Sequence, residues 1–396
     1  MRFDGCEKMI YIPAIGQSHF ITRFILTLDN HTGNKCMQFY GKRFIFSNFI
    51  LLFWLTIPST ESLRAMETTD CLGTISLQLS QSLELNLEQI AESIKALADE
   101  YVLIYEVTPP MGEAEKALWM KHALERGKTM SFHPFSKGRE PAFQAPVPAY
   151  LFYNGRHITP NVTRELKTFV SLAPLFKATY RTFHYSWVYM TTVDEAFLIY
   201  PYLPLDEAVN NLPPTKQGFY KAADFEERRC GWQKPYPDLA GAGMMVTVSY
   251  PVYSGEKLLG VISRDITLTE LSTRLLKPIA GRSKDLFTMI MDKDGLAIAT
   301  SRAAGTKEIS RVNTQACSAV LHYRTPQGLK SLGNQKAVDS SNALFNEAGE
   351  NALAAVKKEP HAETWQLNVK MGPTTHKAAV ARIPATGWLL ITIDTD

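Results

Sequence analysis

Cysteine is scarce in this sequence, and the cysteines are not arranged as a disulfide framework or a zinc site would require. The 396 residues include five cysteines, which lie far apart and form no Cys-x-x-Cys pair. The nine histidines are also scattered, without the spacing that metal ligands need. We therefore expect neither a metal ion nor another cofactor, and the cysteines alone leave the redox compartment open.

An excess of charge of one sign is also missing. Lys and Arg number 42 against 39 Asp and Glu, the net charge is +3, and no long basic run occurs. A surface that binds nucleic acid needs basic residues gathered on one face. We therefore expect no nucleic acid among the partners of this chain.

The sequence lacks the short motifs of common enzyme classes. It contains no Gly-x-Ser-x-Gly elbow, no His-Glu-x-x-His helix and no phosphate-binding loop. Gly241-Ala-Gly243 lacks the third glycine of a dinucleotide loop and leads into a predicted strand, whereas a phosphate cradle opens a helix. Acidic pairs such as Asp194-Glu195 are more typical of solvated turns than of acid–base catalysis. We therefore predict that the protein is not an enzyme.

Long apolar runs are limited to one segment near the start of the chain. Residues 44–58 are mostly apolar and follow Lys42 and Arg43, and positive charge commonly precedes an export signal or a membrane anchor. The run of 15 residues is short for a membrane span, which needs about 20, and suits a signal-peptide core of about 7–15. We expect residues 1–60 to be an N-terminal extension with a signal peptide or a short membrane anchor at 44–58. A buried strand or helix is the alternative.

The length of chain before this apolar run is unusual for a signal peptide. A start at Met37 would leave a short basic region in front of the run. We therefore expect translation to begin at Met37 and residues 1–36 to be absent from the native protein, which N-terminal sequencing would test.

A long amphipathic helix follows. Between Leu72 and Val102 apolar residues recur at steps of three and four, which places them on one face of a helix. Good helix formers fill the other faces, and Asp70 is suited to be the N-cap. The apolar face could pair with its copy in a homodimer or pack on the rest of the chain.

Two units that combine helices with strands follow this helix. In the first, a strand at 149–153 precedes Asn154-Gly155, a pair typical of a hairpin turn. The other predicted elements of the first unit are strands at 185–190, 196–200, 244–253 and 257–266 and helices at 162–177, 218–225 and 268–278. The second unit has a predicted hairpin of strands 286–291 and 296–300, a helix at 343–357, and strands at 365–371, 376–382 and 388–393. This order of elements predicts an α+β fold.

Aromatic residues are dense between Tyr180 and Tyr253. Aromatic side chains with polar tips line small-ligand pockets because they supply apolar walls and hydrogen-bonding groups together. Any single one of them could equally belong to the core. The group comprises Trp187, Tyr189, Tyr200, Tyr202, Phe219, Tyr220, Trp232, Tyr236, Tyr250 and Tyr253.

Six motifs in this region resemble, in order and spacing, the membrane-distal half of a double Cache sensor domain. Such domains are typical of bacterial histidine kinases, chemoreceptors and nucleotide cyclases, and the resemblance extends over residues 72–396. Asp292-x-Asp-Gly295 and Thr386-Gly-Trp388 resemble the start and end of the membrane-proximal half. The six motifs are Tyr185-Ser-Trp-Val-Tyr189, Ile199-Tyr-Pro-Tyr-Leu-Pro204, Phe219-Tyr-Lys-Ala-Ala223, Trp232-x-x-Pro-Tyr-x-Asp238, Val246-Thr-Val-Ser-x-Pro-Val-Tyr253 and Gly260-Val-x-x-x-Asp-Ile-Thr-Leu268.

The resemblance implies a long N-terminal helix followed by two tandem PAS-like lobes, each built on an antiparallel sheet. After the extension at 1–60, we expect the long helix and a connecting segment at 61–145. We then expect the membrane-distal, ligand-binding lobe at 146–280 and the membrane-proximal lobe at 281–396.

The resemblance also implies where a ligand binds, namely between the short helix around Tyr220 and the distal sheet. Family members that bind amino acids or amines hold the ligand carboxylate with an Arg-x-Trp-Tyr motif and its ammonium group with a later Asp. Here Tyr220 matches the Tyr, Phe219 takes the Trp position, Gln217 takes the Arg position, and Asp265 matches the later Asp.

An amide at position 217 cannot reproduce the bidentate, charged grip of an arginine on a carboxylate. These residues therefore stay compatible with recognition of an amine, while recognition of a standard α-amino acid is in doubt unless Lys216 supplies the missing positive charge. Asp265 has a purely structural alternative as the N-cap of the helix that begins near Leu268.

The sequence thus predicts an extracytoplasmic small-molecule sensing domain of a bacterial signal-transduction receptor, held at the inner membrane. The expected ligand is a small polar molecule, and an amine-containing one is an option that the site residues leave open. The output domain of such receptors is absent from this sequence, so we expect a truncated receptor or a separate signalling partner. The alternative is a free periplasmic protein that delivers its ligand to a receptor or transporter. The candidate ligand-binding residues are Trp187, Tyr189, Tyr202, Gln217, Phe219, Tyr220, Tyr236, Asp238 and Asp265.

Overall fold

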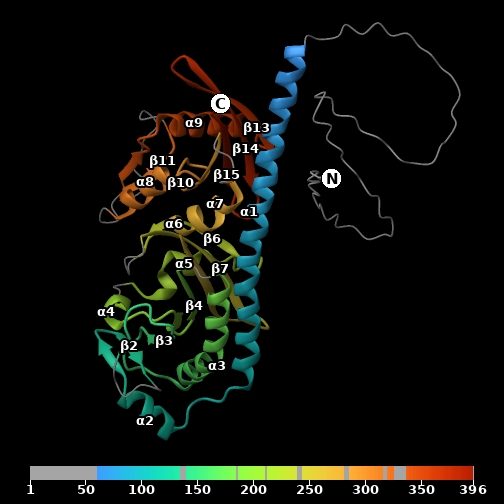
Figure 1. The fold of residues 1–396 in the computed structure, drawn as a ribbon. Helices are drawn as coiled ribbons and strands as arrows, with labels where there is room; N and C mark the ends of the chain where they lie inside the picture. The colour runs from blue at the N-terminus through green and yellow to red at the C-terminus, as the bar shows by residue number, and fades with distance from the viewer. Residues whose placement is uncertain are drawn as a thin grey trace, which may run out of the picture. The chain divides into compact units, whose positions relative to one another are not determined.

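The computed structural model shows a long helix followed by two separate antiparallel sheets (Figure 1), which confirms the predicted α+β class. It describes residues 60–133, 140–183, 186–209, 212–238, 243–280, 285–314, 319–324 and 336–395. The predicted apolar run at 44–58 and the predicted start at Met37 lie outside these ranges. Within them, no helix combines the length and the apolar character that a membrane span requires.

Helix α1 extends over Thr60–Val107. The prediction of Asp70 as its N-cap is wrong, because Asp70 lies inside the helix. No proline or glycine interrupts the chain between Thr60 and Asp70, so nothing in the sequence stops the helix from starting earlier. The predicted apolar face is buried against strands of both sheets. Of the two arrangements predicted for this face, this is the one in which it packs on the rest of the chain. Its buried residues include Leu83, Leu87, Ile90, Ile94, Leu97 and Tyr101.

The first sheet has eight strands in the order β1-β2-β3-β5-β4-β8-β7-β6. The long hairpin of β7 and β8 and the pair of β4 and β5 confirm the predicted strands, whereas β1, β2 and β6 were not predicted. The predicted hairpin turn at Asn154-Gly155 is wrong, since the chain after β3 enters a helix and the Gly155 N–H donates to the Lys128 carbonyl. The strands are β1 Leu124–Arg126, β2 Thr129–Phe132, β3 Ala149–Phe152, β4 Trp187–Thr192, β5 Ala196–Tyr200, β6 Gly231–Pro237, β7 Met244–Ser254 and β8 Lys257–Thr267.

The two faces of this sheet have different neighbours. Because side chains alternate along a strand, Val188 and Met190 on β4 pack in the core shared with α1 and the helix α3. Trp187 and Tyr189 belong to a second cluster on the opposite face. The helices around this sheet are α2 Glu113–Lys121, α3 Pro160–Phe183, α4 Leu205–Ala208, the 3-10 helix η1 Pro214–Lys216 and α5 Gly218–Lys221.

The chain leaves β8 through a continuous helical segment made of α6 Leu268–Glu270, the π-helix η2 Leu271–Leu276 and α7 Lys277–Ala280. Its N-cap is Thr267, whose hydroxyl accepts from the Glu270 N–H while the Glu270 carboxylate accepts from the Thr267 N–H. The structural alternative for Asp265 as the N-cap is therefore wrong.

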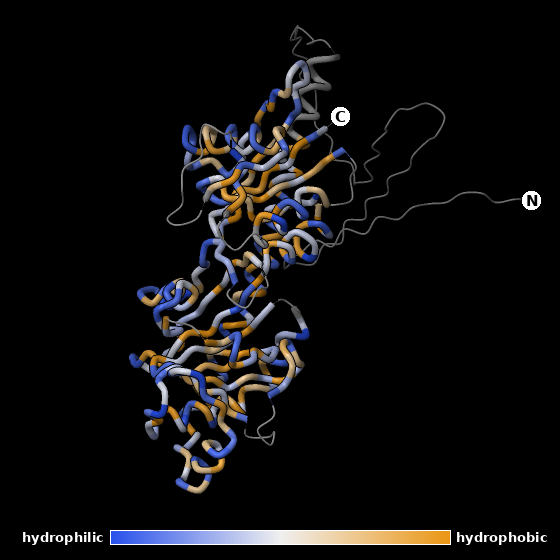
Figure 2. The backbone as a smooth tube through the Cα atoms, turned by 90° about the vertical axis from the view of Figure 1, so that its left-hand side faces the viewer, coloured by the Kyte–Doolittle hydropathy of each residue, from blue (hydrophilic) through white to orange (hydrophobic). Residues whose placement is uncertain are grey.

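The second sheet has five strands in the order β10-β9-β15-β14-β13, all antiparallel. Its strands confirm those predicted from the sequence, and the predicted domain boundaries stay a prediction. Figure 2 shows hydrophobic stretches of the chain, in orange, in both its upper and its lower part. The elements are β9 Leu286–Met291, β10 Ala297–Thr300, α8 Ala303–Thr314, the parallel pair β11 Ala319–His322 and β12 Lys336–Asp339, α9 Ala343–Lys358, β13 Thr364–Met371, β14 Thr374–Ile383 and β15 Trp388–Asp394.

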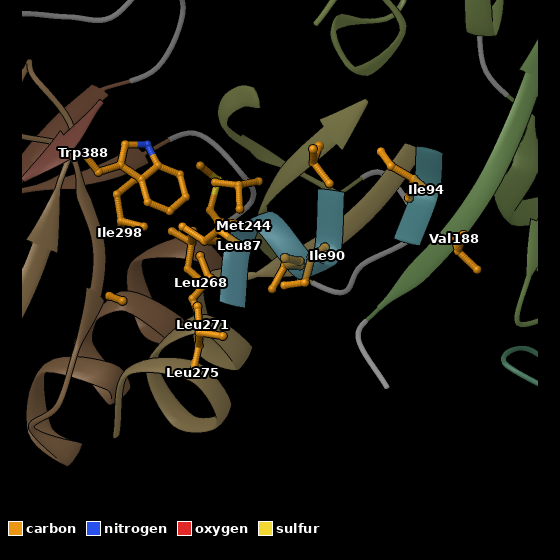
Figure 3. Close-up of a cluster of buried hydrophobic side chains, with 14 of the residues drawn as sticks. Leu87, Ile90, Ile94, Val188, Met244, Leu268, Leu271, Leu275, Ile298 and Trp388 are labelled. Atoms are coloured by element: carbon orange, nitrogen blue, oxygen red, sulfur yellow. The ribbon is translucent and has the colours of Figure 1, made fainter. Parts of the chain in front are cut away.

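One hydrophobic cluster connects α1 with both sheets. Figure 3 shows Leu87 of α1 near Met244 of β7 and Leu268 of α6, with Ile298 of β10 and Trp388 of β15 in the same cluster. All five side chains are buried. Helix α1 therefore packs on both sheets through one continuous hydrophobic cluster.

Candidate functional site

A cavity of about 340 Å³ lies on the face of the first sheet opposite α1 and α3. Strands β4, β5, β6 and β8 and the segments around α4 and α5 line it. Its volume is at the lower end of the range for small-molecule sites. Most of the predicted ligand-binding residues line this cavity, namely Trp187, Tyr189, Gln217, Phe219, Tyr236, Asp238 and Asp265.

Tyr202 and Tyr220 do not line the cavity. The Tyr202 hydroxyl donates to the carboxylate of Glu140, with an O–O distance of 3.0 Å. Tyr220 packs on Phe225 in a separate small cluster. Successive helix residues point about 100° apart, so the one turn of α5 that presents Phe219 to the cavity turns Tyr220 away. A ligand contact for either tyrosine stays a prediction.

Asp265 is the centre of a hydrogen-bonded group at the wall of the cavity. On β8 it lies opposite Trp187 of β4 and Thr247 of β7. Its Oδ1 accepts hydrogen bonds from the hydroxyls of Tyr189 at 2.8 Å, Thr247 at 2.6 Å and Tyr236 at 3.3 Å. All three donors converge on Oδ1, so Oδ2 takes no hydrogen bond from the residues that the structure describes.

The electrostatic state of Asp265 follows from this environment. The side chain is 6% exposed, and burial raises its pKa to about 7, against hydroxyl hydrogen bonds that lower it. The negative charge of Asp238 raises the pKa further. A positive group beside Oδ2 would favour the ionised carboxylate, so the group is suited to hold a cation.

Gln217 lines the cavity, but its side-chain amide is already engaged, because Nε2 donates to the Leu212 carbonyl at 3.0 Å. Lys216 is not among the lining residues, so it does not supply the charge that the amide lacks. In the described part of the chain, no Lys or Arg lines the cavity, whereas Glu207, Asp238 and Asp265 do. The site is therefore acidic.

Two further polar atoms at the cavity have no hydrogen-bond partner among the described residues. They are Nε1 of Trp187, a side chain that is 2% exposed, and Oε1 of Gln233. Both residues line the cavity. Buried polar atoms are rarely left unpaired in folded proteins, but both of these atoms are themselves buried, so they do not define where a ligand binds.

Thr247, Gln233 and Glu207 belong to this site, and the sequence analysis missed them. Counting back from the turn of the β7–β8 hairpin, where Ser254 pairs with Lys257, would set Thr247 opposite Arg264. A register shift between Val252 and Tyr253 moves the pairing by one residue and sets Thr247 opposite Asp265. The predicted hairpin indicated that Thr247 pairs with a residue of β8. The bulge, whose position could not be predicted, decides that this residue is Asp265.

Comparison with protein families gives a match over residues 156–273. The matching family is described as methyl-accepting chemotaxis protein-like, first PDC sensor domain. This confirms the predicted resemblance to a chemoreceptor-type sensor domain for the segment that contains α3 and most of the cavity. It agrees with the prediction of a sensing module and not an enzyme.

Comparison with solved structures gives similar chains at low identity. The ligand-binding domain of the Pseudomonas fluorescens chemoreceptor CtaA, in complex with L-isoleucine, is 13% identical with a TM-score of 0.47, covering 86% of this chain and 97% of that one. The sensory domain of the Campylobacter jejuni chemoreceptor Tlp3, with isoleucine bound, is 12% identical with a TM-score of 0.48, covering 86% and 97%. The ligand-binding domain of the Pseudomonas aeruginosa amino acid chemoreceptor PctC, in complex with GABA, is 14% identical with a TM-score of 0.42, covering 83% and 99%. No curated protein matches the chain.

Proposed function

We propose that this chain is the extracytoplasmic sensing part of a bacterial signal-transduction receptor and that its cavity binds a small ligand through an ammonium group. The observation that carries the proposal is the Asp265 carboxyl group, which lines the cavity with one oxygen held by three hydroxyls and the other without a hydrogen bond from the described residues. An ammonium group supplies both the positive charge and the donors that this oxygen lacks.

The walls of the cavity suit the same ligand. Trp187, Tyr189 and Phe219 present aromatic rings, and ring faces attract a nearby cation. A ligand carboxylate finds no lysine or arginine among the described lining residues. We therefore infer that amines bind better than α-amino acids do.

The proposed receptor contains the ligand-binding lobe at 146–280 and the membrane-proximal lobe at 281–396, and residues 44–58 direct it to the inner membrane as an anchor or an export signal. A signal requires two states that differ in ligand affinity. A mature protein cleaved near residues 60–70 would instead favour a free periplasmic binding protein, and N-terminal sequencing separates the two.

The test is a thermal-shift screen of the full chain against amines, amino acids, carboxylates and nucleobases. A ligand at 100 times its dissociation constant adds about 2.7 kcal/mol to the free energy of unfolding. We expect amines to raise the melting temperature and Asp265→Asn to abolish the rise. Asp99→Asn, which removes the same charge from an exposed position on α1, should leave the rise intact. A folded Asp265→Asn variant that still responds to amines as the wild type does would overturn the proposal.

A further inference from the structure

The cavity extends across three neighbouring strands of the first sheet, from Asp265 on β8 past β4 to β5. Asp265 pairs with Trp187 of β4, and Tyr189 of β4 pairs with Ile199 of β5. All four residues line the cavity. Because neighbouring strands lie about 4.8 Å apart, the direction across the sheet from β8 to β5 covers roughly 10 Å. A ligand whose ammonium group binds Asp265 can therefore extend a body as far as β5.

The β5 end of the cavity is lined by apolar side chains. Phe197 and Ile199 belong to β5, and Leu203 follows that strand. Ala208 ends the helix α4, and Val209 comes directly after it. With the exception of Val209, these side chains are buried in one cluster, which fixes their positions. Such a surface favours the burial of hydrocarbon.

Polar groups at this end are already used within the protein or solvated. The ring of Tyr153 packs on Phe197, with centroids 5.9 Å apart, and its hydroxyl donates to the Ala208 carbonyl at 3.0 Å. Glu207 precedes Ala208 and is exposed, so water solvates its carboxylate. A polar ligand group that loses its water here without a hydrogen bond in return is unfavourable. The β5 end therefore selects an apolar body.

Exposed apolar side chains at the cavity lead to the same conclusion. Val209 and Leu212 line the cavity, although 37% and 46% of their surfaces are exposed. Removal of apolar surface from water is favourable, in proportion to the area that is covered. An apolar ligand body would cover these two side chains, whereas a small ammonium compound at Asp265 would leave them in water.

Starting from the proposed function, we propose that the ligand is a primary amine that carries an apolar body of about the size of one ring. Its ammonium group binds Asp265, and its body lies across β4 against Ile199 and Phe197 of β5, with Val209 over it. The cavity of about 340 Å³ limits the body to roughly this size.

The experiment separates the contribution of the body from that of the ammonium group. Isothermal titration of the full chain uses three probes: 2-phenylethylamine has both parts, ethylamine lacks the ring, and 2-phenylethanol lacks the positive charge. We expect 2-phenylethylamine to bind at least about tenfold more tightly than ethylamine, a difference of roughly 1.4 kcal/mol. It should exceed 2-phenylethanol by a similar factor, because a hydroxyl brings no charge to Asp265.

A matched pair of variants places the body in the cavity. Val209→Ser should reduce the ratio of the affinities for 2-phenylethylamine and ethylamine about threefold, because the ring loses an apolar contact. Val193→Ser is the control: Val193 is 38% exposed, close to the 37% of Val209, but does not line the cavity. The ratio should stay unchanged in Val193→Ser. Equal ratios in the two variants would overturn the placement of the body beside Val209.

The outcomes also distinguish the apolar body from the amine site itself. Equal affinities for 2-phenylethylamine and ethylamine, both lost in Asp265→Asn, would overturn the apolar body and leave an amine-binding site. Binding of 2-phenylethanol as tight as that of 2-phenylethylamine would overturn the amine site, and the proposed ligand with it. If none of the three probes binds to the folded wild-type chain, both proposals are wrong.

Discussion

At the scale of single residues, the Asp265 carboxyl group links the protein's stability to pH. Its pKa of about 7 in the folded chain lies well above the ordinary value of about 3.9, because burial disfavours the charged form. The folded state therefore holds a proton more tightly than the unfolded state does. The contribution of this group to stability is present below about pH 4 and is lost as the pH rises from about 4 to 7. Without ligand, the carboxylate is thus an unfavourable charge at neutral pH.

The affinity for an amine should depend on pH in the opposite direction to the stability contribution of Asp265, and increase as the pH rises. Because an ammonium group binds the ionised carboxylate, we expect its affinity to fall about tenfold from pH 8 to pH 6, as the ionised fraction falls through a pKa near 7. Binding at pH 6 should release close to one proton from Asp265. Titration calorimetry in buffers of different ionisation enthalpy measures both quantities. Asp265→Asn should show no proton release, and an affinity that is the same at pH 6 and pH 8 in the wild type would contradict the assignment.

Much of the candidate site could be predicted from the sequence at this scale. The aromatic positions of β4 came from the density of aromatic residues, and the acid of β8 came from the resemblance to double Cache motifs; Trp187, Tyr189 and Asp265 all line the cavity. The direction of Tyr220 could not be predicted, because a single helical turn decides whether position 219 or 220 faces the sheet. Thr247 required the position of a bulge, which depends on local backbone geometry and not on residue type.

At the scale of elements, the capping box at the start of α6 fixes the exit of the chain from β8. The Thr267 hydroxyl accepts from the Glu270 N–H at 3.1 Å, and Ser186 adds a hydrogen bond to the Glu270 carboxylate at 2.7 Å. Replacement of an N-cap threonine by alanine costs about 1 kcal/mol. We expect Thr267→Ala to lower the free energy of unfolding by about this amount in urea denaturation. Affinity for an amine should not change, because Thr267 does not line the cavity.

The control for this prediction lies in the same helical segment. Thr273 is exposed, and its hydroxyl only donates to the Thr269 carbonyl one turn earlier. Thr273→Ala should stay within about 0.5 kcal/mol of the wild type, as surface substitutions usually do. An equal loss of stability in both variants would show that the capping box does not fix this segment.

Two of the strands that the sequence did not predict, β6 and β1, were concealed for different physical reasons. Strand β6 contains Pro235 and Pro237, and proline argues against a central strand. The strand is nevertheless compatible with proline because it lies at the edge of the sheet, where fewer backbone N–H groups are needed. Strand β1 is three residues long, too short for any alternation to be read. The long β7–β8 hairpin was predictable because two long strand-like segments, 11 residues each in the structure, flank the turn at Ser254-Gly255.

At the scale of the whole described molecule, α1 stabilises both sheets through one apolar face. The helix contacts β7 and β8 of the first sheet and β13, β14 and β15 of the second. Single-sequence reasoning left open whether this face pairs with a second copy or packs on the same chain. The pattern of apolar residues is the same in both cases, and only the positions of the sheets distinguish them.

Leu87 provides the sharpest test of this arrangement, because it lies where α1 meets both cores (Figure 3). The side chain is 1% exposed, and truncation of a buried leucine to alanine costs about 2–5 kcal/mol. If α1 stabilises both sheets, Leu87→Ala should increase amide hydrogen exchange in β8 and in β15 together. Leu85→Ala, two residues away on the same helix and 60% exposed, should change exchange in neither strand. Faster exchange confined to one sheet in Leu87→Ala would mean that the two sheets are stabilised independently of each other.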